Sequence, residues 1–422
     1  MRQMRESIRR RPAAVALSAT LLAAGLQLGT APASAQPAPE GELRSAGPGE
    51  AAVPDGWIVV LKEPARAATA DVSAVARDLL GRAEGARLGH VYRAALHGFS
   101  ARMSRAEAAR TAADPRVAYV RQDTRVRVGA TQGRLTTADQ TQPDAPWGLD
   151  RVDQRRLPLS TTYTYRTTAP DVSVYVIDTG LRTTHREFGG RASVGTDTVG
   201  DGQNGNDCHG HGTHVGGVAA GATYGVAKQA KLIAVRVLDC QGSGTTSGVV
   251  AGVDWVTAKA AGPAVANMSL GGAASDVLDR AVRNSIASGV TYTVSAGSSG
   301  QSGGACATSP SRVPETISVG GSDRSDRVMS SSNHGKCVSL FAPGAQIPSA
   351  WKDSDTATAT LSGTSMATAH AAGAAALHLG LRPADTPALV KKGLVDNATT
   401  GVLQGNPPPA VPDKLLYTLY LP

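Results

Sequence analysis

Short apolar runs alternate with helical stretches along most of the chain, and this alternation constrains the fold more than any other feature. The runs are rich in β-branched residues and cover 172–177, 232–237, 264–268 and 290–294. Helical spacing of apolar residues covers 249–259, 275–288 and 364–377. Continuously apolar runs are typical of parallel strands that are buried on both faces. We therefore predict an α/β fold, a doubly wound and mostly parallel sheet with helices on both faces.

A smaller unit with mixed periodicity precedes this region. Apolar runs predict strands over 57–61, 91–100 and 117–120, and helical spacing predicts helices over 72–80 and 104–113. Ser104 and Glu107 form a capping-box pattern at the start of the second helix. The length and the alternation predict a small α+β domain of about 70 residues.

The first 35 residues have the pattern of a secretory signal peptide. A segment with five arginines is followed by an apolar segment over 13–28 and then by Ala33-Ser34-Ala35, whose small side chains suit cleavage. The alternative is a membrane anchor, but glycine and glutamine interrupt an apolar run that is already short for a span. We expect a secreted, extracellular protein with no membrane attachment once the signal is removed.

The net charge of +8 raises the question of a nucleic-acid partner. Residues 1–35 carry five Arg and one Glu (net +4), residues 36–128 carry 14 basic and 11 acidic side chains (net +3), and residues 129–422 carry 23 and 22 (net +1). Because the excess lies in the N-terminal segments, we expect no nucleic-acid-binding face on the large domain.

All four cysteines lie in the large α/β region. In a secreted chain an even number of cysteines favours disulfides, and four cysteines allow three pairings that spacing alone does not distinguish. Free thiols and a metal site are the alternatives. The chain has no Cys-x-x-Cys pair, which argues against zinc bound through thiolates.

Three short motifs follow one another in the order Asp, His, Ser. Val-Ile-Asp178-Thr-Gly ends an apolar run, His211-Gly-Thr-His214 follows a glycine-rich loop, and Gly363-Thr-Ser365-Met-Ala opens an alanine-rich stretch. A serine hydroxyl needs a base to take its proton, and that base needs a carboxylate to orient it and to stabilise its cation. Each motif alone is common, but the three together predict nucleophilic catalysis by Ser365.

Each motif also has a structural explanation. Asp178 fits a common Asp-Thr-Gly turn, and Ser365 fits a helix N-cap. Three histidines crowd into 209–214, but zinc ligands on a helix need a spacing of four with a Glu between them, and this segment has no Glu. We interpret His214 as a packed histidine and His209 as an exposed surface residue.

The motifs resemble those of subtilisin-like serine peptidases, nearest to the proteinase K and aqualysin branch, from about Pro146 to the C-terminus. The resemblance is carried by Ala-Pro-Trp147-Gly-Leu-Asp, Val-Tyr-Val-Ile-Asp178-Thr-Gly, His211-Gly-Thr-His-Val, Tyr-Gly-Val-Ala-Lys228, Ala-Val-Arg-Val-Leu-Asp239, Ala-Asn267-Met-Ser-Leu-Gly-Gly, Leu340-Phe-Ala-Pro-Gly and Gly363-Thr-Ser-Met-Ala. It implies a serine endopeptidase that works through an acyl-enzyme. Asp178 would orient His211, His211 would act as base and then acid, and Ser365 would be the nucleophile.

The small N-terminal domain resembles the inhibitory propeptide of the same family. The resemblance is carried by Trp57-Ile-Val-Val-Leu, Gly98-Phe-Ser-Ala and Val117-Ala-Tyr-Val-Arg-Gln-Asp123. It implies a propeptide over 36–129, with its inhibitor domain at about 55–125, and a catalytic domain over 130–422. The propeptide would act as a folding chaperone and transient inhibitor, and the maturation cut would lie near Ala130.

The resemblance also implies disulfides and a substrate site. The aqualysin-like pattern implies the pairs Cys208–Cys240 and Cys306–Cys337. Two backbone segments would hold an extended peptide between them as a third strand. These segments are Gly242-Ser243-Gly244 and Ser269-Leu270-Gly271. We expect protein or peptide substrates, broad specificity with an apolar pocket before the scissile bond, and a monomer.

The sequence departs from the family pattern at the oxyanion site. The family places an Asn, whose amide is the second oxyanion donor beside the nucleophile's N–H, where this chain has Ser298. A serine hydroxyl is shorter but can still donate, so we expect a weakened oxyanion hole formed by Ser298 and Ser365. The chemistry needs no cofactor.

Structural calcium is a further candidate. Asp197, Asp201 and Asp207 flank a glycine-rich loop and offer the oxygen ligands that Ca²⁺ prefers, although they lack EF-hand spacing. Loop acids that contact only water are the alternative interpretation. A calcium site common in relatives similar to proteinase K uses a carboxylate where this chain has Ser339, so the resemblance does not predict that site here.

Two other classes of function compete with the peptidase hypothesis. A catalytically decayed binding protein with the same fold would explain Ser298, because a fold alone does not fix a function. The intact Asp, His and Ser set argues against this alternative. A zinc hydrolase is a more distant alternative, and insensitivity of the activity to a chelator would exclude it.

Overall fold

The computed structural model describes residues 42–47, 50–62, 71–81, 85–128, 135–136, 144–405 and 412–420. The expected signal peptide and the expected cut near Ala130 lie outside the described residues. The chain from Glu40 to Pro422 forms one compact unit. Within the described part of the chain, no helix has the length and apolar character needed to cross a membrane.

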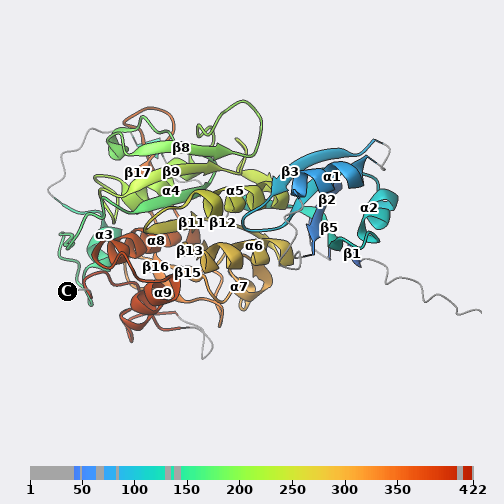
Figure 1. Cartoon of the computed structure of the whole chain (residues 1–422). Coiled ribbons are helices and arrows are strands. Elements are labelled where there is room, and N and C mark those ends of the chain that lie inside the picture. Colours follow the sequence, from blue (N-terminus) through green and yellow to red (C-terminus); the bar gives the residue numbers. More distant parts are fainter. Residues whose placement is uncertain are drawn as a thin grey trace, which may run out of the picture. The chain divides into compact units, whose positions relative to one another are not determined.

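The large domain is built on a seven-stranded sheet in which every neighbouring pair is parallel (Figure 1). Its strand order is β16-β15-β13-β11-β7-β9-β8. The strands are β7 (Ser173–Asp178), β8 (Ala192–Asp197), β9 (Lys231–Arg236), β11 (Ala264–Met268), β13 (Thr291–Ser295), β15 (Ile317–Ser322) and β16 (Leu340–Pro343). All four apolar runs singled out in the sequence are strands of this sheet, whereas β8, β15 and β16 were not predicted.

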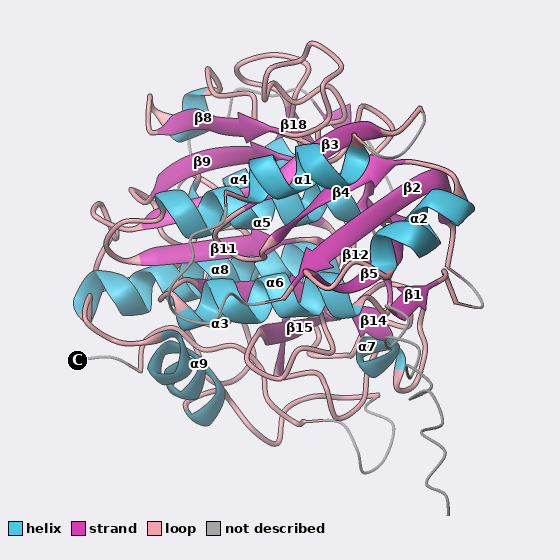
Figure 2. Ribbon diagram, turned by 45° about the vertical axis from the view of Figure 1, so that its right-hand side comes forward, coloured by secondary structure: helices cyan, strands magenta, loops and turns pink. Residues whose placement is uncertain are grey.

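Helices cover both faces of the sheet, as the alternating pattern predicts (Figure 2). Along β7, Val174 and Val176 pack in one core cluster with α4 (His211–Ala220) and α8 (Thr364–Leu381). Tyr175 and Ile177 pack in the other cluster with α5 (Thr246–Lys259) and α6 (Asp276–Ala287). Because successive side chains of a strand point to opposite faces, each strand contributes to both cores. The doubly wound α/β fold is therefore confirmed.

Smaller elements complete the large domain. Three strands form a separate antiparallel sheet in the order β17-β18-β6. The elements are β6 (Leu135–Thr136), α3 (Trp147–Val152), the 3₁₀ helix η1 (Arg186–Phe188), α7 (Gly304–Ala307), β17 (Ile347–Ala350), β18 (Thr358–Leu361) and α9 (Pro387–Asp396).

The N-terminal domain is a small α+β unit, as predicted. Its elements are β1 (Glu42–Arg44), β2 (Ala52–Leu61), α1 (Val72–Leu80), β3 (Arg87–Tyr92), β4 (Gly98–Arg102), α2 (Arg105–Ala112) and β5 (Val117–Val128). Both hydrogen bonds of the predicted capping box are present at the start of α2. The single strand expected over 91–100 is wrong, because β3 and β4 form an antiparallel pair. The segment between them turns away and donates three N–H groups to Asp254.

The strand β5 joins the two domains. Its first half pairs with β2, and its last residues pair antiparallel with both β10 (Ser243–Thr245) and β12 (Leu270–Ala273). On its other side β12 pairs with β14 (Thr308–Ser309). The N-terminal domain therefore places its last described strand between two strands of the large domain.

Two disulfides link loops of the large domain. Cys208 is bonded to Cys240, and Cys306 is bonded to Cys337, which is the pairing that the resemblance implies. The structure describes no free cysteine.

Candidate active site

A buried Asp–His pair lies where β7 ends and α4 begins. Asp178 is the last residue of β7, and His211 is the first residue of α4. His211 Nδ1 lies 2.7 Å from Asp178 Oδ1, and the two side chains are 1% and 0% exposed. The Thr179 N–H also donates to Asp178 Oδ1 at 2.8 Å. The carboxylate therefore fixes both the ring orientation and the tautomer that carries its proton on Nδ1.

The start of α4 is held by a second aspartate rather than by its own N-cap, which is Gly210. Asp207 Oδ2 accepts the N–H and the hydroxyl of Thr213, while Oδ1 accepts the N–H groups of His209 and Gly210. A carboxylate is favourable at a helix N-terminus, where backbone N–H groups lack partners. Asp207 thus fixes the helix position from which His211 projects.

Ser365 is the second residue of α8, and its side chain is fully buried. Ser365 Oγ donates to the Ser269 carbonyl oxygen at 3.1 Å, and Ser269 Oγ donates to the Ser365 carbonyl oxygen at 2.9 Å. Asn267 at the end of β11 donates to Ser269 Oγ at 2.9 Å. This reciprocal pair attaches the start of α8 to the residue that leads into β12.

The structure brings Asp178 and His211 into contact but gives His211 no hydrogen bond to Ser365. His211 Nε2 is buried and lacks a hydrogen-bond partner among the described residues. Asp178 Oδ2 and His214 Nδ1 are likewise buried without a partner among the described residues, although buried polar atoms are usually paired. The helices α4 and α8, which begin with His211 and with the segment of Ser365, pack against each other. Catalytic hydrogen bonds often form only when substrate is bound.

The other two histidines of this segment do not form a metal site. His214 is fully buried, its Nε2 faces the carbonyl oxygens of Ile347 and Ala359, and burial lowers its pKa to about 3. It is a packed histidine, as we expected. His209 is half-buried rather than exposed, because its Nδ1 accepts the His211 N–H at 3.3 Å. Burial lowers the pKa of His209 as well.

Ser298 lies at the N-terminus of α8. Its Oγ accepts the Thr364 N–H at 3.1 Å and lies 2.9 Å from Thr364 Oγ1. Thr364 Oγ1 lies 2.6 Å from Ser295 Oγ, which in turn accepts the Gly297 N–H at 3.3 Å. The hydroxyls of Ser295, Thr364 and Ser298 therefore form a chain whose middle member, Thr364, directly precedes Ser365.

The two predicted substrate segments lie on either side of β5. On one side the Val128 N–H donates to the Gly242 carbonyl oxygen, and on the other Gly271 is opposite Arg127. A Cβ on Gly242 would lie 2.8 Å from the Val128 side chain. Glycine at this position lets a third strand approach closely. β10 and β12 thus hold the extended strand β5 between them by antiparallel pairing.

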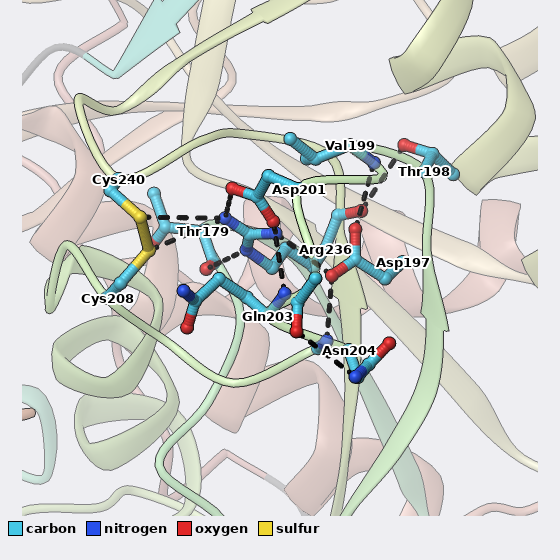
Figure 3. Close-up of polar contacts among 12 residues, drawn as sticks. Thr179, Asp197, Thr198, Val199, Asp201, Gln203, Asn204, Cys208, Arg236 and Cys240 are labelled. Atoms are coloured by element: carbon cyan, nitrogen blue, oxygen red, sulfur yellow. Dashed lines mark hydrogen bonds and ion pairs between the residues drawn. A yellow bond between two sulfur atoms is a disulfide. The ribbon is translucent and has the colours of Figure 1, made fainter.

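The three acids proposed as calcium ligands are used in other ways, and Figure 3 shows two of them, Asp197 and Asp201, beside Arg236. Arg236, fully buried at the end of β9, donates to Asp197 Oδ2 at 2.9 Å and to both oxygens of Asp201 at 2.6 and 2.7 Å. These hydrogen bonds lower the pKa of Asp201 to about 2. Asp207 caps α4. The donor set therefore does not fit calcium, because the guanidinium already holds the charge that a cation would supply.

The same cluster includes the disulfide between Cys208 and Cys240. Both sulfur atoms lie near Asp201, but sulfurs joined in a disulfide are not thiolates and do not offer a metal the usual ligand. Arg236 also donates to the Thr179 carbonyl oxygen at 3.2 Å, directly after Asp178. The cluster therefore supports the end of β7.

Two aspartates for which the sequence predicted no contact connect the domains. Asp123 on β5 is buried and accepts the N–H and the hydroxyl of Ser247 in the first turn of α5, and burial raises its pKa. Asp254 on α5 accepts the N–H groups of Arg93, Ala94 and Ala95 at 3.1, 2.6 and 2.6 Å. A lone acid on a predicted helix carries no sequence signal for such a contact.

Two family models match the chain. The model described as subtilase family matches residues 169–411. The chain belongs to the subtilase family. A second model, described as peptidase inhibitor I9, matches residues 57–129, which cover the small domain except β1 and the start of β2. The chain is thus a serine-type endopeptidase of this family that carries an inhibitor propeptide.

Named relatives agree with this assignment. The chain is 50% identical over 335 residues to the extracellular serine proteinase of Thermus sp. (strain Rt41A), covering 79% of this chain and 78% of that protein. It is 43% identical over 377 residues to the alkaline serine exoprotease A of Vibrio alginolyticus, covering 88% and 69%. The crystal structure of a cold adapted subtilisin-like serine proteinase is similar, with a TM-score of 0.63 and 50% identity, covering 65% of this subtilase and 99% of that chain.

Proposed function

We propose that this subtilase is a secreted endopeptidase that hydrolyses peptide bonds through an acyl-enzyme on Ser365. The observation that carries the proposal is the buried Asp178–His211 pair, whose outer nitrogen Nε2 lacks a partner. Relatives named as extracellular proteinases support secretion.

The proposed reaction follows from these positions. Ser365 Oγ attacks the carbonyl carbon of the scissile bond while His211 Nε2 takes the serine proton. Asp178 stabilises the resulting imidazolium without taking its proton. His211 then gives that proton to the leaving amine. In the second half of the reaction a water molecule attacks the acyl-enzyme while His211 takes its proton, and His211 returns this proton to Ser365 Oγ as the acyl group leaves. Ser365 must leave its present hydrogen bond with Ser269 to meet His211.

The oxyanion that forms in this reaction needs donors near the start of α8. We propose the Ser365 N–H and the Ser298 hydroxyl. The hydroxyl chain supports this role. If Ser295 donates to Thr364 and Thr364 donates to Ser298, then Ser298 Oγ accepts two hydrogen bonds and its own proton is free for the substrate oxygen.

The register of β5 suggests where the precursor is cut. Val128 is opposite Leu270, and Arg127 is opposite Gly271. A peptide that continues in this register places its next residue opposite Ser269, whose carbonyl oxygen binds Ser365 Oγ. We therefore propose that the enzyme cuts its own precursor between residues 129 and 130.

The burial of the β5 side chains indicates which substrate side chains the site favours. Val126 on β5 is 3% exposed and packs in the core cluster that contains Leu238 and Leu270, whereas Arg125 and Arg127 are exposed. The groove therefore favours an apolar side chain at the position of Val126 and tolerates charge at its neighbours. We retain an apolar pocket directly before the scissile bond and broad specificity as part of the proposal.

Labelling of the nucleophile tests this function. The purified secreted product should hydrolyse casein, and a fluorophosphonate should stop the activity and form an adduct that peptide mass spectrometry assigns to Ser365. A zinc chelator should leave the rate unchanged. A correctly folded product that neither hydrolyses casein nor takes the label would support the non-catalytic binding protein instead.

Asp254 provides a testable contact between the propeptide and the catalytic domain. Asp254→Ala removes the acceptor of three backbone N–H groups in the segment between β3 and β4. Hydrogen bonds to a charged group stabilise more than neutral ones, so these three amides should exchange with deuterium about tenfold faster or more. Hydrogen exchange of the full chain carrying Ser365→Ala measures this without any contribution from activity.

The exposed Asp353, which pairs with its neighbour Lys352, provides the matched control. Asp353→Ala should leave exchange in the segment between β3 and β4 unchanged. Equal protection of that segment in Asp254→Ala and in the parent would show that Asp254 does not hold the propeptide.

A further inference from the structure

The ammonium group of Lys391 on α9 lies where a metal ion could bind backbone oxygens. Its Nζ donates to the carbonyl oxygens of Pro314 at 2.5 Å and of Thr316 at 2.8 Å. The Ser339 hydroxyl donates to the same Thr316 oxygen at 3.5 Å. Burial lowers the pKa of Lys391. Carbonyl and hydroxyl oxygens around one point are ligands that Ca²⁺ accepts, but here a lysine is bound to them.

The segment that Lys391 holds supports the substrate groove. Pro314 and Thr316 lie in the connection between β14 and β15. The strand β14 pairs with β12, with Ser309 opposite Gly272, and β12 forms one wall of the groove around β5. A cation that fixes this connection therefore stabilises the outer edge of the substrate-binding strands.

The surroundings do not fit a calcium ion. The side chain of Ser339, whose hydroxyl contacts the Thr316 carbonyl oxygen, is neutral and would give a cation no carboxylate ligand. A hollow of about 410 Å³ beside this point is lined by no acidic residue within the described chain, whereas four basic residues line it, namely Arg312, Lys336, Lys391 and Lys414. A divalent cation here would meet like charge and no carboxylate among the residues that line this hollow.

Two acids that line a hollow together with Lys391 are already paired. Glu315 forms an ion pair with Arg283, and Asp396 forms one with Lys392. They line a neighbouring hollow that Lys391 also borders. The charge of Glu315 attracts the Lys391 ammonium, and both acids are already held in these ion pairs.

Arg236 shows the same principle at a second place in the domain. Its guanidinium satisfies Asp197 and Asp201, the two acids that would otherwise offer oxygen ligands to a cation. At both places a side chain of the protein supplies the positive charge. The two places lie on different elements, β9 and α9, so each observation is independent of the other.

We propose that the Lys391 ammonium is a built-in cation that takes the place of calcium at the connection between β14 and β15. The connection then keeps its geometry without a metal, and the thermal stability of the domain does not depend on calcium at this site. Introducing a carboxylate by Ser339→Asp and removing the ammonium by Lys391→Met should convert the carbonyl oxygens of Pro314 and Thr316 into a calcium site.

Thermal unfolding of the full chain tests this proposal, with Ser365→Ala present throughout to prevent autolysis. The set is the parent, Lys391→Met, Ser339→Asp, the double variant of these two, and the exposed Lys336→Met as matched control, each in chelator and in millimolar CaCl₂. In chelator, Lys391→Met should lower Tm by about 5 °C, and Lys336→Met should change it by less than about 1 °C. Calcium should raise Tm of the double variant by several degrees more than that of Ser339→Asp alone.

The rise in Tm on adding calcium is compared between Ser339→Asp and the double variant. Both proteins carry the new carboxylate and only Ser339→Asp retains the ammonium, so a difference between them shows whether the ammonium occupies the place of calcium. A calcium response shared equally by all five proteins belongs to another site and cancels in this comparison. The proposal is overturned if Lys391→Met unfolds at the same temperature as Lys336→Met. It is also overturned if calcium stabilises Ser339→Asp as much as the double variant.

Discussion

Ser365→Ala should abolish peptidase activity and leave the secreted chain as an uncleaved precursor. In the proposed mechanism this hydroxyl attacks the carbonyl carbon, and removal of a serine nucleophile from a triad costs about 10⁶ in kcat. The same hydroxyl would cut the bond after residue 129, because the β5 strand already lies in the groove beside Ser269. A gel of the secreted product and casein hydrolysis measure the two effects.

The exposed Ser325 provides the matched control for this variant. Ser325→Ala should be processed and active like the parent. A mature band from pure Ser365→Ala would contradict self-cleavage by this nucleophile. Adding active enzyme to Ser365→Ala distinguishes an inaccessible bond from a missing nucleophile. If the precursor is cleaved only after this addition, the bond is accessible and the variant lacks only its own nucleophile.

The architecture of the large domain could be predicted from local sequence pattern. The four central residues of β7, Val174 to Ile177, are all apolar or aromatic, and only a sheet covered on both faces buries all of these side chains. The pattern was weaker for β15, whose Gly-Gly-Ser end carries little apolar signal, and for the short β16. These two strands were missed because their burial comes from neighbouring strands and from α8.

In the small domain the strand prediction over 91–100 failed for a different reason. The apolar residues of 91–100 suggested one strand, but the chain turns between Tyr92 and Gly98 because Asp254, far away in the sequence, accepts the N–H groups of that turn. Such a contact depends on tertiary structure that no local periodicity encodes. Arg236 and Lys391 are further examples, since the partners of both lie on other elements.

The candidate site was predictable to the extent that its residues occur in short motifs. The positions of Asp178, His211 and Ser365 follow from sequence, and the structure joins the first two by a 2.7 Å contact. The surroundings of Ser298 did not follow. Its bond to the Thr364 N–H shows that this hydroxyl also caps α8, a second task that the sequence comparison with an Asn does not reveal.

Ser298 accepts the Thr364 N–H and, in the proposed mechanism, also donates to the oxyanion. An Asn at this position would have to perform both functions. An Asn side chain carries both an acceptor and a donor, so its oxygen could accept the Thr364 N–H while its NH₂ group reaches toward the oxyanion. The serine hydroxyl has to satisfy both demands with one oxygen. Its proton is free for the substrate only when the chain of hydroxyls from Ser295 runs in the favourable direction.

Ser298→Asn should therefore raise kcat with little change in KM. The oxyanion exists only in the transition state and the tetrahedral intermediate, so a better donor acts on the chemical step and not on ground-state binding. Full restoration of one oxyanion donor is worth about 10²-fold in kcat. The gain should be smaller if Asn333, which holds the 296–301 loop through Ala296 and Gln301, keeps that loop in its present position. Steady-state kinetics on a peptide anilide measures kcat and KM separately.

Two control substitutions, one at residue 299 and one at residue 298, show whether the gain in kcat is specific to an amide at residue 298. Ser299→Asn makes the same chemical change one residue away, where the hydroxyl donates to Asn333, and it should give no gain in kcat. Ser298→Ala removes the hydroxyl and should lower kcat if that hydroxyl donates to the oxyanion. If Ser298→Asn only matches the parent or falls below it while Ser298→Ala loses activity, Ser298 already donates well and the enzyme is not impaired. If neither substitution changes kcat, another group stabilises the oxyanion, and Ser298 serves only as the cap of α8.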